Sequence, residues 1–206
     1  MSNVRPLMNT VSRGNQFEDR VFSALRKEVN AERLGLLPRQ CALFQKKGYF
    51  SRDRDSDVIV DISIEVTIPE ATSWSFLWVC ECKDYSGSIP VDNVEEFKAK
   101  LDQIAGKNVK GLMAITGALQ SGAAAYARAQ GIGVVRLLPS DQVDWMMHFE
   151  TTHSSERRLD ANEFNRALTT PSYRSRNSDF FGRSDGYIFD SWQGLLRRAL
   201  ASAKEA

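Results

Sequence analysis

Two apolar runs separated by a short break, residues 57–66 and 74–83, constrain the fold of this chain most strongly. In the first run the apolar side chains fall on every second position, namely Val58, Val60, Ile62, Ile64 and Val66. A period of two is the pattern of a β-strand with one buried face. The second run is rich in aromatic and β-branched residues, which are favoured in strands. We therefore predict a β-hairpin with an apolar face.

The turn of this hairpin determines which side chains face one another. Residues 69–73 break the apolar pattern, and a loop centred on Ala71 places Asp61 opposite Glu81. Lys83 lies two residues further along the same strand and therefore shares the face of Glu81. Two carboxylates and a lysine would then converge on one patch of an otherwise hydrophobic hairpin.

Charged groups at such a place need an explanation, because burying them without partners or a metal is costly. We therefore predict a functional site, with a structural ion pair on a solvated sheet face as the alternative. A five-residue loop fixes the register only weakly. Asp57 and Glu65 lie on the same face of the first strand as Asp61, so either of them can replace it if the register slips.

The composition indicates a cytoplasmic protein that does not enter a membrane. With 206 residues, 42% of them hydrophobic, the chain suits one domain with an appendage or two small domains. No apolar run approaches the roughly 20 residues that span a bilayer, and the first residues lack the apolar region of a secretory signal. The cysteines, Cys41, Cys80 and Cys82, are few and odd in number, which suits a reducing compartment.

The net charge of +1 gives the whole chain no basic footprint of the kind typical of nucleic-acid-binding proteins. This counts modestly against a nucleic-acid partner, although acidic catalytic residues would offset a local basic groove in the total.

The chain before the hairpin is predicted to contain a helix and a strand. Asn15 suits a helix N-cap, with Glu18 three residues later in the position of a capping box. Residues 41–45 read as a first strand. Residues 46–56 form a charged connector, either a solvated loop or a loop that contacts phosphates.

After the hairpin, strands and helices alternate. The pattern predicts a helix capped by Asp92 and ending at Gly106, a strand over residues 110–116, a helix from Ser121 to residue 130 and a strand over residues 132–138. This alternation argues for an α/β layer with at least one parallel pair of strands.

The character of the chain changes past residue 139, and we treat residues 140–206 as a mainly helical and loop extension of unknown role. Residues 141–149 suit a helix, and residues 169–185 are especially loop-like. A final amphipathic helix from Ile188 through Trp192 to Leu200 either packs on the core or contacts a partner.

Taken in order, these residues resemble the Mrr-like restriction endonuclease domain of the PD-(D/E)xK nuclease superfamily. Residues 14–18 (GNQFE) resemble its GxxFE opening, Asp61 its metal-binding aspartate, and residues 81–83 (ECK) its (D/E/Q)xK triplet. Residues 114–132 resemble its closing strand–helix–strand. The resemblance covers roughly residues 12–139. Mrr-type domains often carry DGGID before the aspartate, whereas this chain has SDVIV at residues 56–60.

The resemblance implies a mixed central sheet flanked by helices, in the order α-β-β-β-α-β-α-β. It implies an endonuclease that hydrolyses DNA phosphodiester bonds with Mg²⁺, or Mn²⁺ in its place, in restriction and defence or in DNA repair. Asp61, Glu81 and the main-chain carbonyl of Cys82 would hold the metal. Lys83 would orient or deprotonate the attacking water, or offset negative charge, with its protonation state open. Glu18 would be an outer-shell acid or a ligand to a second ion.

Other functions fit the same residues. The chain can be a non-catalytic DNA-binding or scaffold module, or a nuclease subunit active only with a helicase or NTPase partner. A homodimer is a further arrangement. The intact set of Asp61, Glu81 and Lys83 favours the enzyme, because a binding module has no need of it. The chain contains no Walker motif, so translocation along DNA would require another protein.

Overall fold

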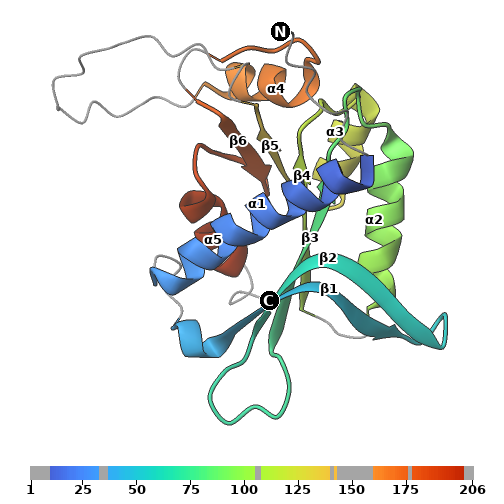
Figure 1. Cartoon of the computed structure of the whole chain (residues 1–206), viewed down its shortest axis with the longest axis vertical. Helices are drawn as coiled ribbons and strands as arrows, with labels where there is room; N and C mark the ends of the chain where they lie inside the picture. The colour runs from blue at the N-terminus through green and yellow to red at the C-terminus, as the bar shows by residue number, and fades with distance from the viewer. Residues whose placement is uncertain are drawn as a thin grey trace, which may run out of the picture.

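The computed structural model describes residues 10–32, 37–104, 108–139, 142, 160–175 and 178–201. Its centre is a seven-stranded mixed sheet in which the strands lie in chain order (Figure 1). The elements are α1 (Thr10–Asn30), the 3-10 helix η1 (Pro38–Gln40), β1 (Cys41–Ser51), β2 (Ser56–Val66), β3 (Phe76–Lys83), α2 (Val91–Gln103), β4 (Val109–Ile115), α3 (Ser121–Ala129), β5 (Gly133–Leu137), α4 (Ala161–Thr169), β6 (Phe180–Ser184), β7 (Tyr187–Phe189) and α5 (Trp192–Ala201).

The sheet is antiparallel at both edges and parallel in its centre. The neighbouring pairs β1–β2, β2–β3, β5–β6 and β6–β7 are antiparallel. The pairs β3–β4 and β4–β5 are parallel and are connected by α2 and α3, because a parallel pair needs a crossover. The expected α/β layer with a parallel pair is therefore confirmed.

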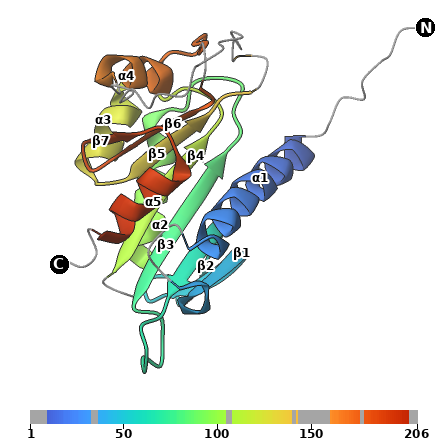
Figure 2. The same cartoon turned by 90° about the vertical axis from the view of Figure 1, so that its left-hand side faces the viewer.

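One face of the sheet is covered by α1 and α5. We call the apolar layer between them and the sheet the α1-side core. Its buried residues include Phe17, Val21, Leu25, Ile62, Ile64, Trp78, Cys80, Val135, Phe180 and Leu195. Helix α1 runs alongside β2 and β3 (Figure 2).

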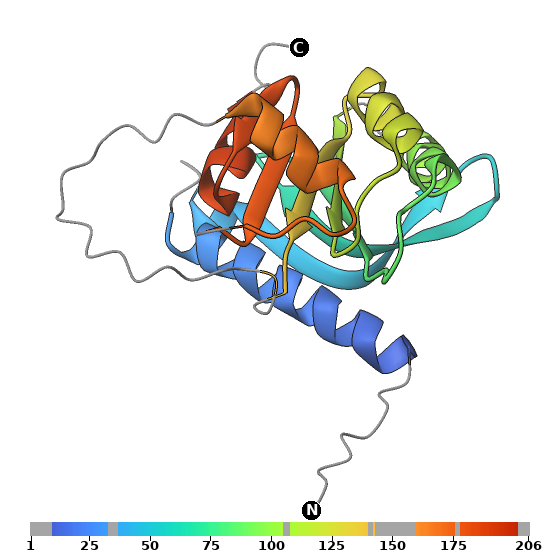
Figure 3. The same ribbon diagram turned by 90° about the horizontal axis from the view of Figure 1, so that it is seen from above.

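The opposite face is covered by α2, α3 and α4, and we call this layer the α2-side core. Figure 3 shows α1 on one side of the sheet and α2 and α3 on the other. The buried residues of this core include Val60, Leu77, Val79, Phe97, Met113, Ala127, Phe164 and Phe181. The neighbours Leu77 and Trp78 belong to different cores, as the alternation of a strand buried on both faces requires.

The register of the β2–β3 hairpin is the one predicted from its loop. Ile62 lies opposite Cys80 and Val66 lies opposite Phe76. The ladder stops after the pair Ile62–Cys80, so Asp61 stands at the point where β2 leaves β3.

The predicted alternation along β2 is interrupted at this same point. Ile62 and Ile64 pack in the α1-side core, whereas Val60 packs in the α2-side core. On the partner strand Lys46 has a φ of 51°, and no pair is formed between Lys46 and Asp61. A left-handed residue within a strand kinks it. The β1–β2 ribbon therefore turns over at Lys46 and Asp61, and a single apolar face along β2 was a wrong prediction.

Two predictions for the N-terminal part are also wrong. Helix α1 begins at Thr10, so Asn15 and Glu18 lie inside the helix and form no capping box. The added N-terminal turn of the helix contacts the rest of the fold, because the Arg13 guanidinium donates a hydrogen bond to Asp84. The connector predicted over residues 46–56 is largely strand: β1 pairs with β2 up to Ser51–Ser56, because ladder hydrogen bonds outweigh the polar composition.

The two helix starts after the hairpin are close to their predicted places. Helix α2 begins at Val91 with Pro90 as its N-cap residue, and α3 begins at Ser121 with Gln120 in that role. Asp92 is therefore a helical residue two positions after the N-cap of α2, and Ser121 lies one position after that of α3. Shifts of this size are usual at helix ends.

The C-terminal part adds to the same sheet. Residues 180–184 form β6 rather than a loop, because Phe180 and Phe181 alternate between the two cores. The final helix is confirmed as α5, although Ile188 belongs to β7. The helix predicted over residues 141–149 lies outside the described residues, except for Gln142. None of the helices among the described residues is long and apolar enough to cross a bilayer.

Candidate active site

Glu81 is the most deeply buried acid of the predicted site, with 3% of its surface exposed. Its Oε1 accepts hydrogen bonds from Lys83 Nζ at 3.1 Å and from Lys100 Nζ at 2.9 Å. Its Oε2 is also buried but has no hydrogen-bond partner among the described residues. A buried carboxylate oxygen without a partner is costly, and such a group commonly marks a position for a water, an ion or a substrate.

Lys100 was not predicted as a site residue. It extends from α2, on the edge of the apolar face that carries Phe97, and Glu96 lies 3.6 Å from its ammonium group. The available signal was helical spacing, since a lysine three residues after a buried phenylalanine points near the sheet. Which strand residue it meets depends on the position of α2 over the sheet.

Lys83 retains its proton in this environment. Burial by itself would lower the pKa of Lys83, but the charge of Glu81 and the hydrogen bond to it outweigh that effect, so the pKa is raised. The structure thus favours a charged Lys83, which donates hydrogen bonds and offsets negative charge, over one that removes a proton from water.

Asp61 occupies a different position from Glu81. Its Oδ2 accepts a hydrogen bond from the main-chain N–H of Cys82 at 2.9 Å. The Cys82 N–H of β3 has no main-chain acceptor on β2, because the β2–β3 pairing ends at Ile62–Cys80. The Asp61 side chain satisfies this donor instead. Its Oδ1 accepts a hydrogen bond from Lys46 Nζ at 3.1 Å. Asp61 is therefore held by the backbone of the Glu81–Lys83 triplet.

Glu18 belongs to the group around Asp61. Its carboxylate binds Lys46 Nζ at 2.6 Å, so Lys46 bridges α1 and β2. Burial raises the pKa of Glu18, and the nearby charge of Asp61 raises it further, while the bond to Lys46 opposes both. The bonds to these two carboxylates also raise the pKa of Lys46, although burial acts in the opposite direction.

The thiols of β3 behave as structural groups. A hydrogen bond with Cys80 raises the pKa of the Cys82 thiol, and burial and the charge of Asp61 raise it further. A protonated thiol is a poor metal ligand, because the thiolate is the coordinating form. Any contribution of Cys82 to metal binding would therefore come from its main-chain carbonyl.

The predicted site residues thus form two adjoining groups. Glu81, Lys83 and Lys100 lie on the α2 side of β3, while Asp61, Lys46 and Glu18 lie toward α1. Within the described residues, the two groups are joined through the main chain, since Asp61 binds the N–H of the residue that follows Glu81.

The other two acids of β2 lie elsewhere. Glu65 is opposite Leu77 and accepts hydrogen bonds from Lys47 and from the Tyr49 hydroxyl. Asp57 is opposite Phe50, close to the β1–β2 turn. Neither contacts the Glu81–Lys83 segment, so Asp61 is the acid of this strand that does.

The fit to a divalent ion rests on Glu81. No three or more acid, histidine or cysteine side chains in the described part of the chain gather as a metal cluster. Mg²⁺ does not need such a cluster, because it keeps several waters and binds proteins through one or two carboxylates. The unpartnered Oε2 of Glu81 is a hard oxygen of the appropriate kind.

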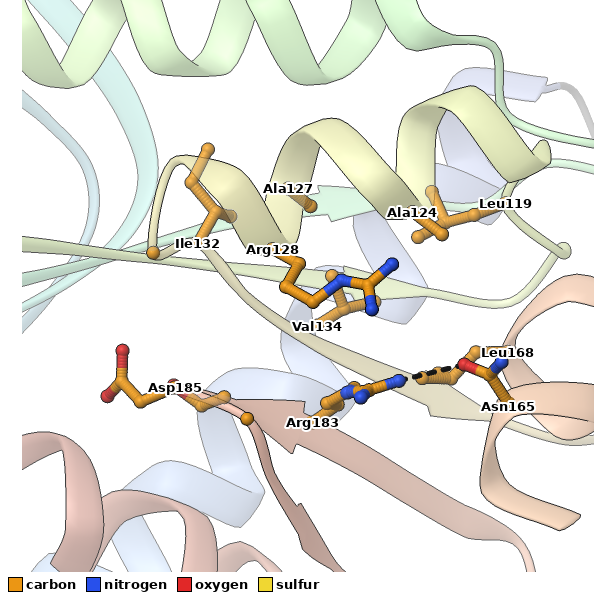
Figure 4. Close-up of a pocket in the computed structure, with 13 residues that line it drawn as sticks. Leu119, Ala124, Ala127, Arg128, Ile132, Val134, Asn165, Leu168, Arg183 and Asp185 are labelled. Atoms are coloured by element: carbon orange, nitrogen blue, oxygen red, sulfur yellow. Dashed lines mark hydrogen bonds between the residues drawn. The ribbon is translucent and has the colours of Figure 1, made fainter. Parts of the chain in front are cut away.

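A small pocket between α3, α4 and β6 is separate from these groups (Figure 4). Arg183 donates a hydrogen bond to the side-chain oxygen of Asn165 at 2.8 Å, and Arg128 extends over the same hollow. Its volume of about 30 Å³ accommodates about one or two waters, so it is too small for a nucleotide.

Two α2 lysines are exposed to a similar extent but have differently buried partners, Glu81 for Lys100 and Asp102 for Lys98, which leads to a stability prediction. Lys100→Ala is expected to lower the free energy of unfolding by about 1–2 kcal/mol, because Glu81 loses one of two charged partners but keeps Lys83. Lys98 is the matched control, since its partner Asp102 is exposed on the same helix. Lys98→Ala should change stability by less than about 0.5 kcal/mol. Urea unfolding measures both, and equal effects would contradict a buried role for Lys100.

The comparisons with known proteins concern the family and the fold of the chain. A family model described as a restriction endonuclease, the catalytic domain of the Mrr type, matches residues 39–147, more than half of the chain. The chain belongs to the Mrr-type restriction endonuclease family. This Mrr-type protein accordingly has a restriction-endonuclease-like fold, and its family is one of nucleases that generally use divalent metals. The matched region contains Glu81, Lys83 and Lys100, whereas Glu18 precedes it.

A solved structure described as a repair endonuclease from Pyrococcus abyssi is also similar to the Mrr-type protein. The two share 16% sequence identity with a TM-score of 0.38, and the match covers 66% of this chain and 50% of that one. The match therefore spans only half of the Pyrococcus abyssi protein. No curated protein sequence matches the chain.

Proposed function

We propose that this Mrr-type protein is a metal-dependent endodeoxyribonuclease whose active site is built around Glu81 and Lys83. The observation that carries the proposal is the buried Glu81 carboxylate, which has one oxygen bound by two lysines and the other unpartnered. Hydrolysis of a phosphodiester needs an activated water and stabilisation of the negative charge that builds up on the phosphate. Positioned cations provide the second requirement.

A bound Mg²⁺ or Mn²⁺ would supply Lewis acidity and a water of lowered pKa. Glu81 through Oε2, Asp61 and the main-chain carbonyl of Cys82 are the groups that would hold it. Lys83 keeps its proton and donates to a phosphate oxygen, offsetting charge in the transition state. Glu18 and Lys46 orient Asp61 from the α1 side, because Lys46 binds both carboxylates.

DNA is the substrate that this family membership favours, and restriction or DNA repair is the process. The test incubates the purified protein with supercoiled plasmid and Mg²⁺, Mn²⁺ or EDTA. We expect nicked and linear products with either ion and none with EDTA. Intact plasmid under every condition, with and without a helicase or NTPase partner, would refute the proposal.

Substitution of the β2 acids tests which of them acts at the site. Asp61→Asn is expected to lower the cleavage rate by about a hundredfold, because a neutral amide supports neither a metal nor the Cys82 N–H equally well. Asp57→Asn and Glu65→Gln should stay within about threefold of wild type, since these acids lie away from Glu81. Initial rates of plasmid loss measure this, with melting temperatures as a check on folding. A loss of activity in Glu65→Gln alone would indicate that Glu65, and not Asp61, acts at the site.

A further inference from the structure

An open cleft of about 940 Å³ lies at the ends of β3 and β4. One wall is α1, which contributes Arg13, Gln16 and Arg20. The other wall is the loop that follows Lys83, beginning with Asp84. The cleft therefore continues directly from the strand that carries the proposed catalytic lysine. The carboxyl ends of parallel strands are a common place for ligands in open α/β sheets.

The lining of the cleft is positively charged. Arg13 and Arg20 contribute two exposed guanidinium groups from α1, and Asp84 is the single acid among the described lining residues. The guanidinium of Arg136 also lies at this cleft but is buried and bonded to main-chain oxygens. Arg13 and Arg20 are seven residues apart on α1 and so project from one face of the helix. The Arg13 guanidinium is about half exposed and lies 3.4 Å from Asp84, a long contact that leaves other N–H groups of Arg13 for a second anion. The charge pattern suits a phosphodiester backbone.

Tyr85 lines this cleft from the loop that follows β3. Its side chain is 42% exposed, yet the residue is held at both ends. The main-chain N–H of Tyr85 donates to the Thr116 hydroxyl at 3.1 Å, and the Tyr85 hydroxyl donates to Asn93 at 3.2 Å. A fixed and exposed aromatic ring beside a positive groove is the arrangement on which unpaired bases stack.

Among the residues that line the cleft, the loop after β3 packs closely against the loop after β4. A Cβ atom at Gly117 would lie only 2.4 Å from the main-chain oxygen of Gly87. No side chain fits at this position unless the loops move, so the backbone beside Tyr85 is closely packed.

We propose that this cleft binds single-stranded DNA, with Tyr85 stacking on a base and Arg13 and Arg20 contacting phosphates. The inference rests on the proposed nuclease function and specifies its substrate as DNA with an unpaired strand next to the scissile bond. In a fully paired duplex the bases are stacked inside the helix, so Tyr85 would meet none of them without unpairing energy.

The test is fluorescence anisotropy of the whole protein in EDTA, so that binding is measured without cleavage. The probes are a labelled single-stranded oligonucleotide, the blunt duplex of the same sequence and that duplex with a single-stranded tail. We expect the single-stranded and tailed probes to bind at least about tenfold more tightly than the blunt duplex.

Variants separate stacking from charge. Tyr85→Leu should weaken single-strand binding by about tenfold, whereas Tyr85→Phe keeps the ring and should bind nearly as wild type. Arg20→Ala should weaken it about threefold to tenfold and reduce its salt dependence by about one released ion. Arg26→Ala is the matched control, because Arg26 lies over the ring of Phe22 on the same helix outside the cleft. It should bind as wild type.

Equal binding of the single-stranded and blunt probes would overturn the inference, as would wild-type binding by Tyr85→Leu. A loss in Arg26→Ala as large as that in Arg20→Ala would also overturn it. The nuclease function is tested separately. Binding that depends on Tyr85 and Arg20 without cleavage of any DNA would support the cleft and refute the nuclease. Plasmid cleavage by a protein that shows no preference for single-stranded probes would support the nuclease function and refute the single-strand cleft.

Discussion

Lys83→Ala is expected to abolish DNA cleavage while the protein stays folded. The rate should fall by at least about 10²–10³-fold, the usual effect of removing one positioned group that stabilises transition-state charge. Lys83 is held 3.1 Å from Glu81 Oε1, and its raised pKa keeps it charged at neutral pH. The phosphate would lose a cation at the site where negative charge develops.

The fold should survive this substitution because Glu81 keeps a second cation. Lys100 Nζ remains 2.9 Å from Glu81 Oε1, so the buried carboxylate is not left without a charged partner. We expect a loss of about 1–2 kcal/mol, which for a chain of this size lowers the melting temperature by about 2–8 °C. Initial rates of plasmid cleavage, measured below the melting transition, separate lost chemistry from lost folding.

Two further lysine substitutions sharpen the result. Lys98→Ala removes the same charge from α2, where Lys98 pairs with the exposed Asp102, and should cleave as wild type. Lys83→Arg keeps the charge but replaces a compact ammonium by a wide planar group, so most of the activity should still be lost. Wild-type rates in Lys83→Ala would place the chemistry elsewhere in the protein.

Arg136→Met is expected to have the largest effect on stability. The Arg136 side chain is 2% exposed and donates hydrogen bonds to the main-chain oxygens of Thr116, Ala167, Thr170 and Pro171. It thereby fastens the C-terminal end of α4 to β5, and a cation is well placed at that negative end of the helix. Methionine fills similar space but leaves these carbonyls without their donors.

The expected loss is about 3–5 kcal/mol, or about 6–20 °C in melting temperature. Arg136→Lys should lose less, because it retains the charge but reaches fewer carbonyls. Arg183→Met on the neighbouring strand β6 is the control, since Arg183 makes one hydrogen bond to Asn165 and should cost less than about 1.5 kcal/mol. Urea unfolding measures all three. An effect of Arg136→Met no larger than that of Arg183→Met would contradict a fastening role.

The chemistry of the site was partly predictable because a hairpin is a local structure. A period of two and a loop centred on Ala71 were sufficient to place Ile62 opposite Cys80, and hence Asp61 near the triplet that begins with Glu81. The strand–helix alternation after Lys83 likewise predicted the parallel centre of the sheet. Both patterns depend on residues that are close together in the chain.

The partners of these acids were not predictable in the same way. Lys100 reaches Glu81 from α2, and Lys46 reaches Asp61 because β1 takes a left-handed φ of 51° at that residue. The local pattern around Lys46 indicated a solvated or phosphate-binding connector rather than a strand. The pairing of β1 with β2 makes this segment a strand.

The sequence by itself determined the hairpin, its register, the α/β order and the Glu81–Lys83 triplet, because periodicity and loop length act between near neighbours. The tertiary structure decided that Glu81 is clamped by two lysines, that Asp61 instead binds Cys82, and that β6 extends the sheet. These contacts depend on how helices lie across the sheet and where the β1–β2 ribbon turns over. Such geometry is set by the packing of the whole core, which no local pattern records.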